Sequence, residues 1–388
     1  MKKIRFVLTP LLLLLILWGN AQPPSDIQWS ADGNSYYESG TDGIVQYQLP
    51  SFSKTTLVAK SILIPEGKTE ALQLRNFFFS DDAKKLLIYT NTKKVWRLDT
   101  RGDYWILDLT TKKLKQLGKK LPESSLMFAK FSPDGNKVAY VSKHNIYMED
   151  LKTGIVKQLT KNGTDRMING TFDWVYEEEF GCRDGFRWSP DSKGIAFWQI
   201  DATKIRNFLM INNTDSIYSF VVPVEYPKVG ESPSPCRVGV IDISSGAIKM
   251  MNVPGDARQH YIPRMEWAYN SSELILQQLN RKQNKTSIFI CNAKTGAAKP
   301  IYTESDKAWI DIKSYWNHGD PAGWDWLDNG KSFLWVSEKD GWRHIYRLTK
   351  DGRETLITKG NYDIISLEAA DEKAGYLYFS ASPENATQ

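Results

Sequence analysis

Cysteine and histidine are scarce in this sequence of 388 residues. The three cysteines are Cys182, Cys236 and Cys291, and no Cys-x-x-Cys pair occurs. An odd number without a pairing motif argues against a disulfide framework, although one bridge stays open in an oxidising compartment. The four histidines, His144, His260, His318 and His344, are dispersed along the chain. Because metal-ligand spacing is absent, we expect neither a metal ion nor another cofactor.

A cluster of basic residues is also missing. The formal net charge is +5, but lysine and arginine are scattered along the chain rather than gathered in one segment. Scattered charge favours solubility and provides no patch for a phosphate backbone. We therefore expect no nucleic-acid partner.

Long apolar runs are absent beyond the N-terminus. Residues 1–5 are basic, residues 6–18 are apolar, and residues 19–21 are small or polar and end in Ala21. This pattern predicts a secretory signal peptide over residues 1–21 and a mature chain over residues 22–388. The apolar run is shorter than the about 20 residues that a membrane span needs, and an uncleaved anchor is the alternative. We expect a periplasmic or secreted protein with no membrane span after cleavage.

Residues 173–180 read Asp-Trp-Val-Tyr-Glu-Glu-Glu-Phe and place three carboxylates in a row between aromatic residues. Like charges in a row are costly to constrain without a cationic partner. Asp173 could cap the N-terminus of a short helix, and Tyr176 and Phe180, four residues apart, would pack that helix on a scaffold. The carboxylates could then point into a cavity. The alternative is a solvated acidic turn, which would not need the aromatic neighbours.

A second pattern repeats along the whole chain: an aromatic residue, then serine or a small residue, then a turn of Asp, Asn or Gly, then an apolar strand. The aromatic positions are Trp29, Phe79, Phe131, Trp188, Trp267 and Trp326, about 50 to 80 residues apart, with a degenerate seventh copy at residues 368–371. Several short strands per unit at such a period are typical of β-propeller blades. Aromatic residues make up 12% of the chain, which also favours sheet. We predict an all-β fold, a β-propeller with seven recognisable blades, and an extended insertion over residues 207–235.

The acidic segment resembles the glutamate motif of the dipeptidyl peptidase IV family of serine exopeptidases. The resemblance continues in Trp188-Ser189-Pro190-Asp191, in Tyr226-Pro227-Lys228 and in Trp96-Arg97, and it runs from about Ile27 to Phe379. It implies a propeller of eight blades followed by an α/β-hydrolase domain. This chain ends at Gln388 and contains no Gly-x-Ser-x-Gly motif, so we expect a fragment without the closing blade and without the hydrolase domain. No catalytic residue is therefore assigned within it, and the isolated fragment should be inactive.

The resemblance also implies a substrate site. The second and third glutamates of the family's motif bind the α-ammonium of the substrate, and here they are Glu178 and Glu179. Two adjacent carboxylates suit an ammonium because they form charge-assisted hydrogen bonds with it. The family's arginine after tryptophan, which holds a substrate carbonyl, corresponds to Arg97, with a surface strand residue as the alternative interpretation. The segment from Thr303 to His318 has no clear match, and nothing is carried over there.

Three functions are compatible with these observations. The first is the substrate-gating propeller of a secreted dipeptidyl peptidase that acts on peptides with a free N-terminus and removes X-Pro or X-Ala dipeptides. The second is a non-catalytic periplasmic propeller that binds peptide or protein partners, because fold alone does not decide function. The third is a relative with tripeptide specificity, against which the paired glutamates argue. Formation of a homodimer is left open.

Overall fold

The computed structural model describes residues 27–95, 97–312 and 324–384. The predicted signal peptide, Trp96 and His318 lie outside these ranges. The described residues form antiparallel β-sheets, with one α-helix, α1 (Trp174–Phe180), and one 3-10 turn (Lys60–Leu63). The predicted all-β class is therefore confirmed. The chain divides into two compact units, residues 1–117 and residues 118–388.

The first unit contains two four-stranded antiparallel sheets, each with its strands in sequence order. The strands of the first sheet are β1 (Gln28–Trp29), β2 (Ser35–Gly40), β3 (Gly43–Gln48) and β4 (Ser53–Ala59). Those of the second sheet are β5 (Leu74–Phe79), β6 (Lys85–Val95), β7 (Leu98–Asp108) and β8 (Leu114–Gln116). Apolar side chains from both sheets, including Ile44, Phe77 and Leu107, are buried together in one core.

The second unit begins with a four-stranded antiparallel sheet and continues with a five-stranded one. The first consists of β9 (Met127–Phe131), β10 (Lys137–Ser142), β11 (Asn145–Asp150) and β12 (Val156–Gln158). The second consists of β13 (Met167–Asn169), β14 (Phe186–Trp188), β15 (Gly194–Asp201), β18 (Cys236–Asp242) and β19 (Ile248–Met250). The predicted insertion includes a two-stranded hairpin of β16 (Asn207–Asn212) and β17 (Phe220–Glu225), which lies between β15 and β18 in the sequence.

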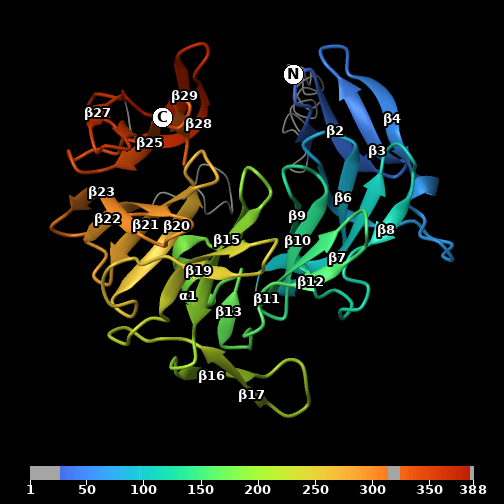
Figure 1. Ribbon diagram of the computed structural model, residues 1–388, viewed down its shortest axis with the longest axis horizontal. Helices are drawn as coiled ribbons and strands as arrows, with labels where there is room; N and C mark the ends of the chain where they lie inside the picture. Colours follow the sequence, from blue (N-terminus) through green and yellow to red (C-terminus); the bar gives the residue numbers. More distant parts are fainter. Residues whose placement is uncertain (1–26, 96, 313–323, 385–388) are drawn as a thin grey trace, which may run out of the picture. The chain divides into compact units, whose positions relative to one another are not determined.

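Two more four-stranded sheets and a two-stranded one complete the second unit. The third sheet consists of β20 (His260–Trp267), β21 (Glu273–Asn280), β22 (Lys285–Asn292) and β23 (Ala298–Ser305), which Figure 1 shows side by side. The next consists of β24 (Trp326–Leu327), β25 (Ser332–Ser337), β26 (His344–Thr349) and β27 (Glu354–Leu356). The last consists of β28 (Ile364–Asp371) and β29 (Tyr376–Ala381).

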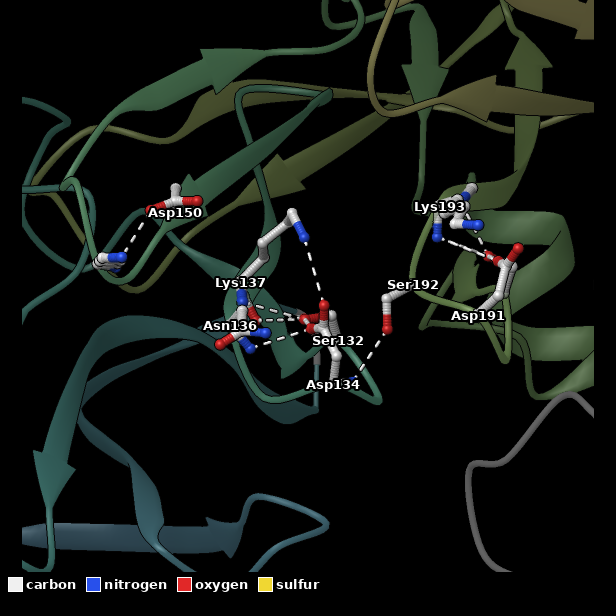
Figure 2. A network of polar contacts seen from close by, with 11 residues as sticks. Ser132, Asp134, Asn136, Lys137, Asp150, Asp191, Ser192 and Lys193 are labelled. Carbon is white, nitrogen blue, oxygen red and sulfur yellow. Dashed lines mark hydrogen bonds and ion pairs between the residues drawn. The ribbon is translucent and has the colours of Figure 1, made fainter.

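The repeated aromatic residues hold equivalent places in these sheets. Trp29, Phe79, Phe131, Trp188 and Trp267 each end the strand that opens their part of the repeat, and Trp326 lies in β24. The serine that follows the aromatic closes a turn. In the copy over residues 131–137, Ser132 Oγ donates to Asp134 Oδ1 at 2.6 Å and accepts from Lys137 N at 3.0 Å, as Figure 2 shows. The same serine-to-aspartate bond occurs at Ser30, Ser80 and Ser189. The recurring sequence pattern is thus a recurring turn.

Polar contacts join neighbouring sheets of the second unit in the same repeating way. The indole of Trp188 donates to the carbonyl of Lys130 at 3.3 Å, and the indole of Trp267 donates to the carbonyl of Arg187 at 3.2 Å. Side chains of these strands and of the segment before β14 form a chain of ion pairs. Lys130 pairs with Asp184 at 2.5 Å, Arg187 pairs with Asp184 at 3.4 Å, and Arg187 pairs with Glu266 at 3.2 Å. Three successive sheets are therefore linked next to the segment that carries α1.

Candidate functional site

The acidic segment forms α1, and its flanking residues explain where the helix begins and ends. Asp173 is the N-cap, as predicted, and its Oδ1 accepts from the backbone N–H of Tyr176 at 3.1 Å. Gly181 follows the last turn with a φ of 65°, a left-handed conformation that glycine adopts without strain. The intervening seven residues make about two turns, so the three glutamates occupy the second half of a short helix.

Aromatic residues form the support on which α1 lies. Tyr176 and Phe180 are buried, which confirms their predicted packing role. The Tyr176 ring lies 5.6 Å from that of Phe172 and 5.3 Å from that of Phe180, and the Phe180 ring lies 5.1 Å from that of Tyr261 on β20. On the other flank the Trp174 ring lies 4.4 Å from that of Tyr226, which follows the inserted hairpin. Aromatic contacts therefore hold the helix both through Tyr176 and Phe180 and through Trp174.

Three hydrogen bonds from distant parts of the chain hold the N-cap, one buried side chain and the last carbonyl of α1. Ser234 Oγ donates to Asp173 Oδ2 at 2.6 Å, and both residues are buried. The backbone N–H of Ile262 donates to the Tyr176 hydroxyl at 3.0 Å. Arg264 donates from Nη2 to the carbonyl of Phe180 at 3.0 Å. Burial raises the pKa of Asp173, and the bonds from Ser234 and Tyr176 oppose that rise.

The three glutamates differ in their surroundings. Glu177 and Glu178 are partly buried, whereas Glu179 is exposed. Burial raises the pKa of Glu177 to about 7; the Arg183 guanidinium opposes this rise, and the carboxylates of Asp173 and Glu178 add to it. Consecutive helix positions are about 100° apart, so Glu178 and Glu179 extend from adjoining sides of the helix. Glu177 is partly buried and lies within electrostatic range of Asp173 and Arg183.

Tyr261 connects this helix with a neighbouring cavity. Burial raises the pKa of its hydroxyl; the Arg281 guanidinium opposes the rise and the Glu179 carboxylate adds to it. The Arg281 guanidinium lies 5.9 Å from the Tyr261 ring and donates to the carbonyl of Glu231 at 2.8 Å. Glu231 and Arg281 line a cavity of about 450 Å³ together with Trp309.

Arg97 lies in the turn between β6 and β7, with an exposed side chain, and belongs to the first unit. Its predicted contact with a substrate carbonyl stays a prediction, as do the ammonium contacts of Glu178 and Glu179. Cys182, Cys236 and Cys291 are buried free thiols. Among the described residues there is no group of His, Cys, Asp and Glu side chains that could hold a metal ion. Nor does that part of the chain contain a helix long and apolar enough to cross a membrane.

Two residues of the site were not identified from the sequence. Ser234 stands between two prolines, near the end of the predicted insertion over residues 207–235. Arg264 lies in the middle of β20, a strand whose residues are almost all buried. The only other basic residue of this strand is His260, at its start. A charged side chain inside a buried strand needs a polar partner. The arginine among apolar residues in this strand is therefore the sequence signal that points to a buried contact of Arg264. The partner itself lies 84 residues earlier and could not be read from the sequence.

The family described as the dipeptidyl peptidase IV N-terminal region matches residues 80–388. The chain belongs to this family. A probable dipeptidyl-aminopeptidase B of Coccidioides posadasii is 26% identical over 96% of this chain and 44% of its own length. The inactive dipeptidyl peptidase 10 of Rattus norvegicus is 24% identical over 91% of this chain and 45% of its own length. The predicted resemblance to the dipeptidyl peptidase IV family is therefore confirmed.

Solved structures support the same assignment. The crystal structure of Porphyromonas gingivalis dipeptidyl peptidase 4 matches 92% of this chain and 50% of its own with a TM-score of 0.82 and 29% identity. A putative dipeptidyl aminopeptidase IV from Bacteroides ovatus has a TM-score of 0.69 at 19% identity, over 92% of this chain and 49% of its own, and shows the fold. The chain is thus the N-terminal propeller region of the dipeptidyl peptidase IV family. It spans about half the length of the relatives that it matches.

Proposed function

We propose that this chain is the substrate-gating propeller of a secreted serine dipeptidyl peptidase, and that Glu178 and Glu179 bind the free N-terminus of the peptide substrate. The enzyme would remove X-Pro or X-Ala dipeptides. The observation that carries this proposal is a short helix, held near both ends, that presents two adjacent glutamates of which one is partly buried and one exposed.

The chemistry of the α-ammonium explains why two carboxylates are needed. The group carries a positive charge and three hydrogen-bond donors, and charge-assisted bonds to carboxylates are among the strong ones. At a separation of about 4 Å and an effective dielectric of about 20, each charge contact is of the order of 4 kcal/mol before desolvation is subtracted. A polypeptide that runs past this point has no ammonium to offer, so the carboxylates would reject it.

Arg97 would contribute a second contact, to a carbonyl oxygen of the bound peptide. Its guanidinium offers five donors in a fixed geometry, which suits a carbonyl or a carboxylate. The serine nucleophile and its histidine and aspartate partners would come from a hydrolase domain encoded downstream. This assignment follows the names of the relatives, which are dipeptidyl peptidases about twice as long as this chain.

A non-catalytic propeller is the second candidate. It is favoured by the relative from Rattus norvegicus, whose name describes it as inactive. In that case the acidic helix could still bind a basic or amino-terminal group, but no peptide bond would be cut. The two functions differ in whether a catalytic serine, histidine and aspartate are encoded after residue 388.

The test has two parts. The gene is sequenced beyond codon 388, where the proposal expects a Gly-x-Ser-x-Gly motif followed by an aspartate and a histidine. The full-length protein is then assayed with a chromogenic Ala-Pro substrate that has either a free or an acetylated N-terminus. Rapid hydrolysis of the free substrate alone supports the proposal. A downstream sequence without a nucleophile, together with no hydrolysis, would establish the non-catalytic function instead.

A further inference from the structure

The helix that carries the glutamates is too short to hold its own direction. An isolated helix of fewer than about 12 residues is marginal in water, and α1 has seven. The direction of Glu178 and Glu179 therefore depends on the tertiary contacts at the two ends of α1. At the N-terminal end these contacts are Ser234 with Asp173 and, one turn later, Ile262 with Tyr176.

At the C-terminal end, beside the ring contact of Phe180 with Tyr261, a charged side chain from β20 binds the helix backbone. Arg264 is only 2% exposed, and its Nη2 donates to the carbonyl of Phe180, the last residue of α1, at 3.0 Å. Its Nη1 donates to the carbonyl of Pro263 at 2.5 Å and lies 3.3 Å from Cys182 Sγ. Carbonyls in the last turn of a helix have no partner within the helix, and a cation there complements the helix dipole. The buried guanidinium thus supplies a hydrogen-bond donor and a positive charge to the carbonyl of Phe180 at the end of α1.

We infer that Arg264 is a positioning residue of the N-terminus site: through the carbonyl of Phe180 it fixes the last turn of α1 and with it the directions of Glu178 and Glu179. This inference rests on the proposed function of the two glutamates. A displacement of about 1 Å at groups that orient a substrate can cost about 100-fold in rate. Loss of the Arg264 contact is therefore expected to reduce the discrimination between free and blocked N-termini, and not the stability of the protein alone.

The geometry also explains why the residue is an arginine. The planar guanidinium reaches the carbonyls of Phe180 and Pro263 with two nitrogen atoms at once. Lysine would keep the charge but concentrates its donors on one atom, so it is expected to hold one of the two carbonyls. The positive charge also lies at the C-terminal end of a helix, where it complements the helix dipole.

The experiment compares Arg264→Ala and Arg264→Lys with the wild type in the full-length protein. The readout is the ratio of kcat/KM for free and N-acetylated Ala-Pro substrates. We expect Arg264→Ala to lower this ratio at least about tenfold, mainly through a higher KM for the free substrate, and Arg264→Lys to lower it less. The matched control is Arg187→Ala, which removes another arginine side chain, one that is partly buried and paired with Asp184 and Glu266. It should lose stability and keep the ratio.

A second readout follows the helix directly. Amide hydrogen exchange of residues 176–181 should be faster in Arg264→Ala than in the wild type, and unchanged in Arg187→Ala. An unchanged ratio in folded Arg264→Ala, or failure of both Arg264 variants to fold, would overturn the inference.

Glu178→Gln and Glu179→Gln, measured in parallel, separate this inference from the proposed function. If they lose the discrimination while Arg264→Ala keeps it, only the role of Arg264 is wrong. If the glutamate variants also keep it, the proposed function fails and the inference with it.

Discussion

The fold disfavours the charge of Glu177. Burial raises its pKa to about 7, from an ordinary value of 4.5, although Arg183 lies close enough to oppose the change. Between about pH 4.5 and pH 7 the folded chain therefore holds a proton at Glu177 that the unfolded chain has released. Stability from this residue is complete below pH 4.5 and decreases as the pH rises towards 7.

The variant Glu177→Gln removes this titration and keeps the size of the side chain. We expect it to be more stable than the wild type by about 3 kcal/mol at pH 8 and nearly equal to it at pH 4, because the wild-type carboxyl is protonated there. Urea unfolding of both proteins at the two pH values measures the difference.

The matched control is Glu179→Gln, which changes the exposed carboxylate two positions further along the same helix. Substitution of an exposed side chain typically changes stability by less than about 0.5 kcal/mol. If Glu177→Gln were no more stabilising at pH 8 than at pH 4, ionisation of the buried Glu177 carboxyl would not lower the stability of the protein, and this account of Glu177 would be wrong.

At the scale of elements, the serine of the repeated turn is buried in the copy at Ser189, whereas Ser244 in another turn is exposed. Ser189 is 1% exposed; its Oγ donates to Asp191 Oδ1 at 2.6 Å and accepts from Gly194 N at 2.8 Å. Ser244 makes a bond of the same length to Asp242 Oδ1 in the exposed turn between β18 and β19. The two serines belong to turns of the same sheet, which makes them a matched pair.

We expect Ser189→Ala to destabilise the second unit by about 1–3 kcal/mol, because it leaves buried groups without their hydrogen-bond partner. Ser244→Ala should cost less than about 0.5 kcal/mol, since water replaces the lost bond at an exposed turn. Urea unfolding followed by tryptophan fluorescence compares the two variants. Equal losses would show that burial of the repeated serine does not set the strength of the turn.

The local features of the elements could be predicted from the sequence, and their long-range partners could not. The aromatic-Ser-Pro-Asp pattern predicted the turns because its bonds join residues only two to five positions apart, as at Ser132. Asp173 was predicted as an N-cap for the same reason, since its backbone partner is Tyr176. Ser234 and Arg264 bind α1 from 61 and 84 residues away, and no local pattern specifies such contacts.

At the scale of the whole molecule, the fold and family were predicted from repetition and from one specific motif. The matched family covers residues 80–388, and the structural likeness to Porphyromonas gingivalis dipeptidyl peptidase 4 covers 92% of the chain. The signal peptide, the substrate contacts and the peptidase activity stay predictions. Relatives of this chain carry the names of dipeptidyl peptidases, one of which is described as inactive.

The central claim is that Glu178 and Glu179 recognise a free N-terminus. Its most direct test is kcat/KM of the full-length protein for free and N-acetylated Ala-Pro substrates, with Glu178→Gln, Glu179→Gln and, as the matched control on the same helix, Glu177→Gln. Glutamine keeps the size and hydrogen-bonding capacity of the side chain and removes its charge.

We predict a loss of about 2 kcal/mol in transition-state stabilisation, about 30-fold in kcat/KM for the free substrate, in each of the first two variants and a smaller loss in Glu177→Gln. Acetylation should abolish most of the activity of the wild type. Wild-type rates in Glu178→Gln and Glu179→Gln, together with equal rates on both substrates, would contradict the account and leave α1 as a solvated acidic helix.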